Sequence, residues 1–328
     1  MKPQQPRLIK PLLLMAFSFL LIITACHSPV TQATKTSTRY LAPKSDCQVI
    51  QHALDEICIP VNPQRIIALD IPWTLDPLLA LGIKPVGTAI YGDESVGFSG
   101  LSPDEVAGIE LVGLTASPSL EKILALKPDL MLSLDVHDDK NYAQLSAIAP
   151  TVLREYDKIK TSFQENFRAI AQLVDQEEKA EKILAQYQKR VEALRKSLGK
   201  PLQGTKTSVI QSDGSNFWIS PKYTNYFQIL NDIGVPLKPI FIKQNESVPF
   251  SIEVIDKFDA DILFIVSHTD KPASHFLQNP LIASLAAVKN NRAYVVEQAI
   301  WYAPYGPLGM NRLLDDISKH LLEAIQTF

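Results

Sequence analysis

The chain has 328 residues, of which 46% are hydrophobic, so it is long enough for two domains of ordinary size with buried cores. Its 32 Lys and Arg against 35 Asp and Glu give a formal net charge of −3, which argues against a nucleic-acid-binding protein with its usual basic face. The six histidines are scattered without a His-rich loop, which disfavours a carrier of bare zinc or manganese.

The amino terminus has the pattern of a bacterial lipoprotein signal. Three basic residues within the first ten precede an uncharged, mostly apolar run over 11–25. That run is too short for a comfortable membrane span and has the length of a signal-peptide core. It ends in small residues directly before Cys26, as the lipoprotein box requires; an unrelated cysteine behind an ordinary signal peptide is the alternative. We predict that 1–25 is removed and that lipidated Cys26 anchors an exported protein on the periplasmic side of a membrane.

The next segment, 26–45, is rich in Thr, Ser, Pro and Ala, which predicts a flexible tether. Cys47 and Cys58 follow, and outside the cytoplasm such a close pair more often forms a disulfide than a metal site. The residues between them resemble two short strands around a turn, so the disulfide would staple a hairpin at the start of the fold. The expected stabilisation is about 2–3 kcal/mol. A redox role is disfavoured because Cys-x-x-Cys is absent.

Beyond the cysteine pair, strand-like and helix-like segments alternate. We predict strands over 65–70, 85–90, 109–113 and 129–135, helices over 72–81, 119–126 and 142–148, and an extended segment over 151–156. Gly82 is placed to end the first helix. This alternation is typical of a mainly parallel sheet with helices on both faces.

The stretch 162–198 contains no Gly or Pro, and its charges alternate with apolar residues at helical spacing. A break near Asp175 predicts two helices, the second about 22 residues or ~33 Å long. That length exceeds a normal crossover and is enough to link two lobes. A coiled coil is disfavoured because the apolar repeat is not sustained over enough heptads.

After 199–204 the alternation of strand and helix resumes. We predict strands over 207–211, 261–267 and 293–296, and helices over 223–233, 251–258, 280–288 and 313–325. The second half of the chain therefore has the same α/β character as the first.

A pattern in the first half recurs in the second. The segment 119–132 reads Ser-apolar-Glu, a short amphipathic run, then Asp and three apolar residues, and 251–264 repeats this order without a gap. A second, shorter similarity relates 78–85 to 229–236. The repeats predict an α/β fold of two Rossmann-like lobes with mainly parallel sheets and a cleft between them. The expected organisation is signal peptide 1–25, tether 26–45, N-terminal lobe 46–160, linking helices 161–199 and C-terminal lobe 200–328.

Several loose motifs in a specific order then point to a family. They are 62–69 at the start of the first lobe, 79–87, 118–121 with 128–130, the long linking helix, and Trp301 with 306–309. From about Cys47 to its end the chain resembles the class III periplasmic solute-binding proteins of ABC importers, which bind iron siderophores, haem and cobalamin. The resemblance implies a monomer of two α/β lobes joined by a rigid helix, with the ligand between the lobes and only modest closure.

The resemblance also gives the repeated Ser-x-Glu a function. In the family, a glutamate on each lobe meets arginines of the membrane permease, and Glu121 and Glu253 match those positions. Local structure offers a second explanation, because Ser119 and Ser251 are suitable N-caps and a first-turn carboxylate stabilises a helix by about 0.3–1 kcal/mol. Both explanations can hold together.

Aromatic residues mark the expected ligand site. Ligands of open α/β sheets lie outside the carboxyl ends of the strands, and all three tryptophans fall in predicted loops near such ends. Aromatic faces suit a large, partly apolar chelate such as a ferric siderophore, although loop packing explains any single one. The predicted ligand-binding residues are Trp73, Tyr91, Trp218, Tyr223, Trp301 and Tyr302.

These observations predict a lipid-anchored protein that captures a ferric siderophore and delivers it to ABC permease subunits, with no cofactor of its own. Haem or cobalamin is the alternative ligand, and His137 or Tyr91 would serve as an axial ligand to haem. A metal-ion receptor, or a surface sensor with the same fold, is a weaker alternative. We predict no enzymatic activity, because Gly-x-Ser-x-Gly, His-Glu-x-x-His and Walker sequences are all missing.

Overall fold

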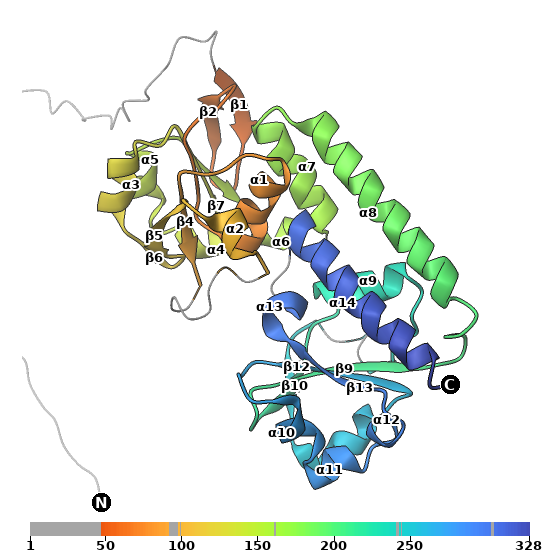
Figure 1. Cartoon of the computed structure of the whole chain (residues 1–328). Helices are drawn as coiled ribbons and strands as arrows, with labels where there is room; N and C mark the ends of the chain where they lie inside the picture. The colour runs from red at the N-terminus through yellow and green to blue at the C-terminus, as the bar shows by residue number, and fades with distance from the viewer. Residues whose placement is uncertain are drawn as a thin grey trace, which may run out of the picture. The chain divides into compact units, whose positions relative to one another are not determined.

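The computed structural model describes residues 47–91, 98, 100–160, 162–240, 243, 245–302 and 305–328, and Figure 1 shows its elements. The predicted signal peptide, Cys26 and the tether lie outside these residues. No helix in the described part of the chain combines the length and the apolar character needed to cross a membrane.

A disulfide-linked hairpin opens the described chain. Strand β1 (Cys47–Gln51) pairs antiparallel with β2 (Glu56–Pro60), and a disulfide joins Cys47 to Cys58, whose Cα atoms are 5.7 Å apart. The Gln48 side-chain amide donates to the carbonyl of Leu173, at 3.3 Å, in helix α7 (Phe163–Leu173). Ile59 is fully buried. The hairpin is therefore held together by its disulfide and is also packed and hydrogen-bonded against the rest of the protein.

The first lobe is built on a six-stranded sheet in the order β6-β5-β4-β3-β7-β8. Every neighbouring pair is parallel except β5 and β6. The strands are β3 (Ile66–Ala68), β4 (Gly87–Ile90), β5 (Glu110–Leu114), β6 (Ser117–Pro118), β7 (Leu130–Leu134) and β8 (Thr151–Arg154). Alternate residues of these strands pack on opposite faces. Ile67 and Met131 join a cluster with α3 (Leu120–Leu126) and α5 (Tyr142–Ser146), whereas Ala68 and Leu132 join the main core.

The second lobe has a five-stranded sheet in the order β11-β10-β9-β12-β13. Strands β9, β12 and β13 are parallel, and β10 and β11 extend the sheet antiparallel. The strands are β9 (Thr207–Ser212), β10 (Phe217–Ile219), β11 (Val248–Phe250), β12 (Ile262–Ser267) and β13 (Ala293–Glu297). The central strand β12 is continuously apolar from Ile262 to Val266 and fully buried there, as a parallel strand covered on both faces must be.

Short helices connect the strands. They are a π-helical turn η1 (Ile71–Leu75), α1 (Asp76–Ala80), α2 (Pro103–Val106), α4 (Asp135–Asp138), α6 (Tyr156–Ile159), α9 (Asn225–Asp232), a 3₁₀ helix η2 (Ile252–Phe258), α10 (Ala273–Leu277), α11 (Pro280–Ala283), α12 (Ala286–Lys289) and α13 (Gln298–Trp301). The two-lobed, mainly parallel α/β fold predicted from the alternation is confirmed.

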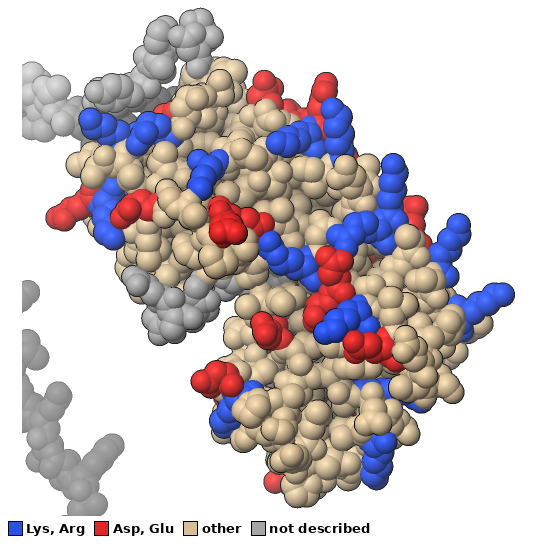
Figure 2. Space-filling view, viewed as in Figure 1, with Lys and Arg blue, Asp and Glu red and all other residues tan. Residues whose placement is uncertain are grey.

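Two long helices join the lobes. Helix α8 (Glu177–Leu198) follows α7 after Asp175, whose φ of 53° ends the first helix, as the predicted break requires. The carboxy-terminal helix α14 (Pro307–Ile325) packs on both α8 and α1, so it returns to the first lobe (Figure 1). Basic side chains project along α8 in Figure 2. The predicted long linking helix is therefore confirmed as α8, and α14 packs beside it as a second connection.

The repeated segments form the same unit twice. Helix α3 spans 120–126 and η2 spans 252–258, and the buried strands β7 and β12 that follow begin at Leu130 and Ile262. An antiparallel edge strand, β6 or β11, precedes each helix. The second similarity, between 78–85 and 229–236, is also structural, because Gly82 and Gly234 end α1 and α9 with φ of 73° and 75°. Both ends close with the same backbone hydrogen bond, from Ile83 to Leu78 at 2.9 Å and from Val235 to Leu230 at 2.8 Å.

Three element predictions are wrong in detail. The predicted helix 280–288 is two short helices, α11 and α12, and the last helix begins at Pro307 instead of 313. Strands β10 and β11 were not predicted. Each has only three residues; β10 pairs antiparallel with β9, and β11 pairs antiparallel with β10 at the edge of the sheet. Such short strands carry too few residues to show a periodic pattern.

Candidate functional site

The carboxyl ends of three neighbouring strands of the first lobe bring together a carboxylate, a phenol and an imidazole. Asp70 follows β3, Tyr91 follows β4 and His137 follows β7. The Tyr91 hydroxyl donates to Asp70 Oδ2 at 2.5 Å, and its oxygen lies 2.5 Å from His137 Nε2. His137 Nε2 and Asp70 Oδ2 are 3.7 Å apart. We call these three residues the Asp–Tyr–His cluster.

Burial differs across this cluster. Asp70 is fully buried, and burial raises the pKa of its carboxyl group. Its Oδ1 accepts from the backbone N–H of Trp73 at 2.9 Å, which caps η1 and fixes the carboxylate in place. Tyr91 is 38% exposed, and burial of its hydroxyl, followed by the Asp70 charge, raises the pKa of its phenol. The cluster therefore presents a neutral phenol at the surface above a buried carboxylate.

A run of aromatic rings leads from this cluster to the second lobe. Trp73 stacks on Tyr305, with ring centroids 4.0 Å apart, and meets Tyr156 edge-on at 5.7 Å. The ammonium group of Lys160 lies 5.7 Å from the ring of Tyr156 and 5.3 Å from that of Tyr223. Lys160 and Tyr156 belong to the first lobe, and Tyr223 belongs to the second. The two lobes thus meet through aromatic faces and one cation.

The second lobe contributes its own aromatic group at the matching sheet edge. His268 follows β12, and its ring lies 4.8 Å from Trp218 and 5.4 Å from Tyr302. His268 Nε2 hydrogen-bonds to Gln211 Oε1 at the end of β9. Burial lowers the pKa of His268 to about 4, so this imidazole is neutral at pH 7. Trp218 is half-buried and Tyr302 is 37% exposed, so both have surface to offer a ligand.

Six tyrosines from the two lobes lie near one another. The pKa of Tyr156 is raised to about 12, by burial first and then by the neighbouring Tyr223 and Tyr302 hydroxyls. The pKa of Tyr305 is raised by burial and by Tyr156, Tyr302, Tyr226 and Tyr223, and Tyr91 responds to Tyr156 and Tyr305. The phenols whose pKa is raised, those of Tyr91, Tyr156, Tyr226, Tyr302 and Tyr305, are therefore neutral at pH 7. Apart from Tyr226, which is fully buried, these tyrosines form an aromatic surface that can hydrogen-bond and carries little net charge.

The structure places the three tryptophans differently from the prediction. None lies in a loop, because Trp73 is in η1, Trp218 in β10 and Trp301 at the end of α13. Trp301 is fully buried, its indole N–H donates to Asp316 at 2.7 Å, and its ring packs 4.5 Å from Phe264. Trp301 is therefore a core residue of the second lobe with no surface for a ligand. Trp73 is 3% exposed and reaches the site only through Tyr305 and Tyr156.

The two repeated glutamates are exposed in the first turns of α3 and η2. Among the described residues, neither Glu121 nor Glu253 makes an ion pair or a side-chain hydrogen bond. Ser119 caps α3 by accepting from Lys122 N at 3.4 Å, but Ser251 makes no side-chain capping bond. The predicted N-cap role thus holds for the first copy only, and local helix capping does not explain why the second copy keeps the pattern.

A carboxylate of the first lobe caps the last helix. Asp76 in α1 accepts from the backbone N–H groups of Leu308 at 3.0 Å and Gly309 at 2.8 Å, in the first turn of α14. A Cβ atom at Gly306 would overlap this carboxylate, so the segment 306–309 is shaped for the contact. Arg312 of α14 also binds both oxygens of Glu105 in α2 at 2.7 Å. These contacts hold the two lobes in one relative position.

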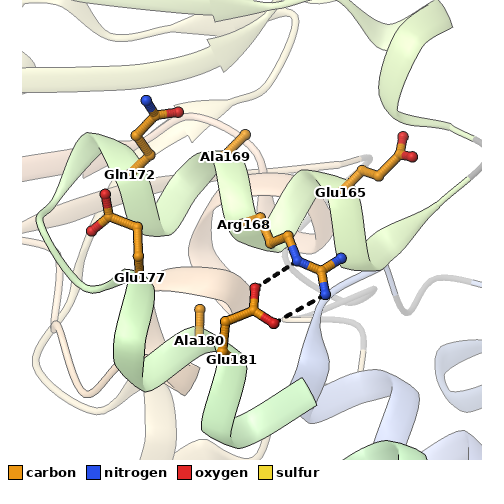
Figure 3. A pocket seen from close by; sticks show the side chains of 7 residues that line it. All are labelled: Glu165, Arg168, Ala169, Gln172, Glu177, Ala180 and Glu181. Atoms are coloured by element: carbon orange, nitrogen blue, oxygen red, sulfur yellow. Dashed lines mark hydrogen bonds and ion pairs between the residues drawn. The ribbon is translucent and has the colours of Figure 1, made fainter. Parts of the chain in front are cut away.

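The hollow between α7 and α8 lies away from the strand ends. The hollow between α7 and α8 in Figure 3 is lined only by residues of those helices and is spanned by an ion pair, with Arg168 Nε 2.6 Å from Glu181 Oε1. It has no residue from the carboxyl end of a strand. In the described part of the chain, no group of three or more His, Cys, Asp or Glu side chains is arranged to hold a metal ion.

Sequence reasoning found part of this arrangement. It included Tyr91, Trp218, Tyr223 and Tyr302 among the predicted ligand-binding residues, and it considered His137 as a ligand of haem or of a bound metal ion. It missed Asp70, Tyr156 and Tyr305. Asp70 carried a usable signal, since it directly follows a buried strand, but Tyr156 and Tyr305 come together only through the packing of α6 and of the segment before α14.

Comparison with known proteins identifies the class. The family model described as a periplasmic binding protein matches residues 78–299, which is more than half of the chain. The protein belongs to this family, whose members are binding components of transporters and not enzymes. Its two-lobed fold is the fold of solved siderophore-binding proteins.

Particular relatives narrow the comparison. The chain is 33% identical over 332 residues to the probable siderophore-binding lipoprotein YfiY of Bacillus subtilis, covering 94% of this chain and 98% of that protein. It is 29% identical over 276 residues to the achromobactin-binding periplasmic protein of Dickeya dadantii, covering 78% and 86% of the two chains. The structure of Staphylococcus aureus SirA complexed with staphyloferrin B superposes with a TM-score of 0.67 at 27% identity, covering 84% of this chain and 98% of SirA.

Proposed function

We propose that the protein captures a ferric siderophore between its two lobes and delivers it to the permease of an ABC importer. The observation that carries the proposal is the meeting of aromatic, uncharged side chains from the strand ends of both lobes, at the place where α/β proteins bind ligands. The names of the relatives, which bind or are thought to bind siderophores, support the same ligand class.

The proposed ligand-binding residues differ from the sequence prediction by two additions and two removals. Tyr91, Trp218, Tyr223 and Tyr302 remain, since each is at least partly exposed at the site. Tyr156 and Tyr305 are added to them. Trp73 packs against both of these rings and does not itself contact the ligand. Trp301 is withdrawn because it is fully buried. The resulting surface of rings and hydroxyls suits a bulky chelate of low net charge better than a bare cation.

Docking to the permease is assigned to Glu121 and Glu253. Their support is the exposure of both carboxylates, their lack of partners among the described residues, and their equivalent places in the two repeats. With one anionic side chain on each lobe, arginines of a two-part permease could form ion pairs with both lobes at the same time. The lobes are taken as 46–160 and 200–328, linked through 161–199.

Export and anchoring complete the proposal. We infer that 1–25 is a signal peptide, that lipidated Cys26 holds the monomeric protein to the membrane, and that 26–45 is the tether. The relative described as a lipoprotein supports this assignment. The Cys47–Cys58 disulfide of the structure fits an oxidising compartment outside the cytoplasm. Mass spectrometry of the protein from membranes tests both points, and an unmodified Cys26 or free thiols at both other cysteines would contradict them.

A titration tests the ligand. The chain without its signal peptide is titrated with ferric siderophores, their iron-free forms, haem, cobalamin and bare metal ions, while tryptophan emission is followed. Half-buried Trp218 beside His268 is the expected reporter. Quenching by a ferric chelate and not by its iron-free form is the expected result. A response to haem or cobalamin alone would keep the fold and replace the ligand.

A further inference from the structure

Charge is unevenly distributed along helix α8. Its first half, 177–188, contains three acidic and two basic residues. The second half together with the two residues that follow it, 189–200, contains five basic residues and one acidic residue. In the first half Lys182 lies 3.9 Å from Glu178, so part of its positive charge is paired within the helix. The carboxyl half therefore carries a net positive charge that the amino half does not.

Three lysines of this carboxyl half lie on the outer face of the helix. Lys189 and Lys196 are seven residues apart, which is about two turns, and Lys200 follows about one turn later. All three are exposed, whereas the buried residues of α8, such as Leu184 and Val191, lie on the opposite face. Among the described residues these lysines make no ion pair or side-chain hydrogen bond. We call Lys189, Lys196 and Lys200 the lysine face.

The surface around the lysine face allows a close approach. The three lysines line a shallow hollow together with Arg195, one acidic residue, Glu192, and the small residues Ala193 and Gly199. The small residues leave the ammonium groups accessible between them. A lysine is a point charge on a flexible stem, whereas an arginine holds a planar anion in a fixed geometry. The lysine face therefore suits an extended layer of anions better than a single rigid carboxylate.

The chain enters the fold beside the start of α8. Gln48, which follows Cys47, donates to the carbonyl of Leu173 at 3.3 Å, shortly before α8 begins. The segment 26–45 has about 20 residues, which reach at most roughly 70 Å. This reach is about twice the ~33 Å length of α8. An anchor at Cys26 therefore keeps the amino end of α8 near the membrane and allows the lysine face to meet the same membrane.

We propose that the lysine face binds the anionic phospholipid headgroups of the membrane that anchors the protein. This inference rests on the proposed lipidation of Cys26. The lipid holds one end of α8 and the lysines hold the other, so two attachments together set the helix along the membrane surface. Each lysine near an anionic surface strengthens binding by about fivefold, and the effect falls off within a Debye length. The contact is therefore weak for each lysine and sensitive to salt.

The membrane-binding surface differs from the surface proposed to dock on the permease. Figure 1 shows α3, whose first turn carries Glu121, on the side of the first lobe away from α8. A protein held along α8 therefore keeps this glutamate turned away from the lipid. Because the lysine contacts are individually weak, the protein can give them up when the permease engages the glutamates.

Vesicle sedimentation tests the lysine face with the chain from Cys26 onward, produced without lipid. The vesicles are either pure phosphatidylcholine or a mixture of phosphatidylcholine and phosphatidylglycerol. Salt is set at about 0.1 M and about 1 M, where the Debye length is about 10 Å and about 3 Å. Wild type should bind the phosphatidylglycerol vesicles at the lower salt only, and should not bind the neutral vesicles. The triple variant Lys189→Gln, Lys196→Gln and Lys200→Gln should bind on the order of a hundredfold more weakly.

Two control variants accompany the glutamine variant. Changing Lys189, Lys196 and Lys200 to arginine keeps the positive charge and should keep vesicle binding. The matched control Lys84→Gln, Lys206→Gln and Lys289→Gln removes three exposed lysines from other elements and should also stay near wild type. The glutamine variant should retain the affinity of wild type for a ferric siderophore, since the lysine face lies outside the proposed ligand site.

Three results would overturn the inference. They are equal binding of wild type to both kinds of vesicle, full binding by the glutamine variant, and an equal loss in the matched control, which would mark an effect of net charge alone. Self-association of wild type without vesicles, if the glutamine variant abolishes it, would also overturn the inference, because the lysine face would then contact a second copy. Sedimentation velocity measures this.

The proposed function fails in different measurements. A wild type that binds no ferric siderophore would remove the proposed capture, and an unmodified Cys26 in protein taken from membranes would remove the proposed anchor. Neither result changes the comparison of the variants on vesicles, so the failure of the lysine face and the failure of the proposed function are distinguishable.

Discussion

The two lobes share one construction and differ at the edge where a ligand would lie. Each has an antiparallel edge strand, a short helix with an exposed glutamate, and a buried parallel strand, and the two copies have equal helix lengths. At the strand ends the first lobe carries Asp70 beneath Tyr91 and His137, whereas the second carries Gln211 beneath His268. The shared part builds the two lobes, and the part that differs gives the strand ends of each lobe a different set of polar groups.

The two lobes also contribute different groups to the contact that joins them. The first lobe supplies a carboxylate, Asp76, and the second supplies the amino terminus of α14 that it caps. A helix amino terminus carries partial positive charge, so the contact is electrostatically favourable as well as hydrogen-bonded. Together with the α8–α14 pair, this contact explains how two similar lobes are kept at a set distance, which a single flexible linker would not do.

We expect the largest effect from removing the exposed glutamate of each lobe, which tests whether the two glutamates are equivalent. The double variant Glu121→Ala with Glu253→Ala should abolish siderophore uptake in cells while the affinity for the chelate stays unchanged. Each single variant should lose part of the uptake. Uptake of the radiolabelled ferric chelate and tryptophan quenching are the two measurements.

A matched control uses carboxylates of the linking helix. Glu178→Ala with Glu192→Ala removes two exposed acidic side chains of α8 and should leave uptake near wild type. Normal uptake in the Glu121 and Glu253 double variant, or an equal loss in the α8 control, would falsify the docking assignment.

The second effect concerns the Asp76 contact and pH. Burial raises the pKa of the Asp76 carboxyl group from its ordinary value of 3.8 to about 7. Between about pH 4 and pH 7 the folded chain therefore holds a proton that the unfolded chain has released, so this group makes the free energy of unfolding fall as pH rises. The full shift corresponds to on the order of 4 kcal/mol. Urea unfolding across this range should show a smaller pH-dependent loss in Asp76→Asn, and identical slopes in both proteins would contradict the assignment.

The third effect probes the close approach of the two lobes at Gly306. Gly306→Ala should destabilise the protein by about 1–3 kcal/mol, because its Cβ would overlap the Asp76 carboxylate. A double-mutant cycle measures the reason. If the overlap is the cause, Asp76→Ala with Gly306→Ala should be no less stable than Asp76→Ala alone. Additive losses would mean that Gly306 is needed for another reason.

The smallest effect compares the two repeated helix ends. Gly82→Ala and Gly234→Ala both place a side chain at a left-handed position, which costs about 1–2 kcal/mol at each. Gly82→Ala should cost slightly more, because its Cβ would lie 2.8 Å from the Lys179 ammonium, which donates to Leu81 O at 2.6 Å. Thermal unfolding of the two variants checks this order. A Gly234→Ala variant that is the less stable of the two would show that the ends are not equivalent.

Local patterns in the amino-acid sequence were enough for the alternation of strand and helix, the break at Asp175, and the two lobes. These features depend on periodicity, on glycine at helix ends and on repetition, all of which act over a few neighbouring residues. The same patterns led to the prediction of Tyr91, Trp218, Tyr223 and Tyr302 as ligand-binding residues, because ligands of α/β sheets bind at the carboxyl ends of the strands.

Tertiary packing alone decided the rest. Trp301 and Tyr302 are adjacent in the chain, yet one is fully buried and the other 37% exposed, because α13 turns one ring into the core of the second lobe. Asp70, Tyr91 and His137 meet because β3, β4 and β7 are neighbours in the sheet, and Asp76 caps a helix more than two hundred residues away. Such contacts depend on how whole helices and strands pack. A sequence pattern that spans a few residues does not indicate which distant residue will lie beside it.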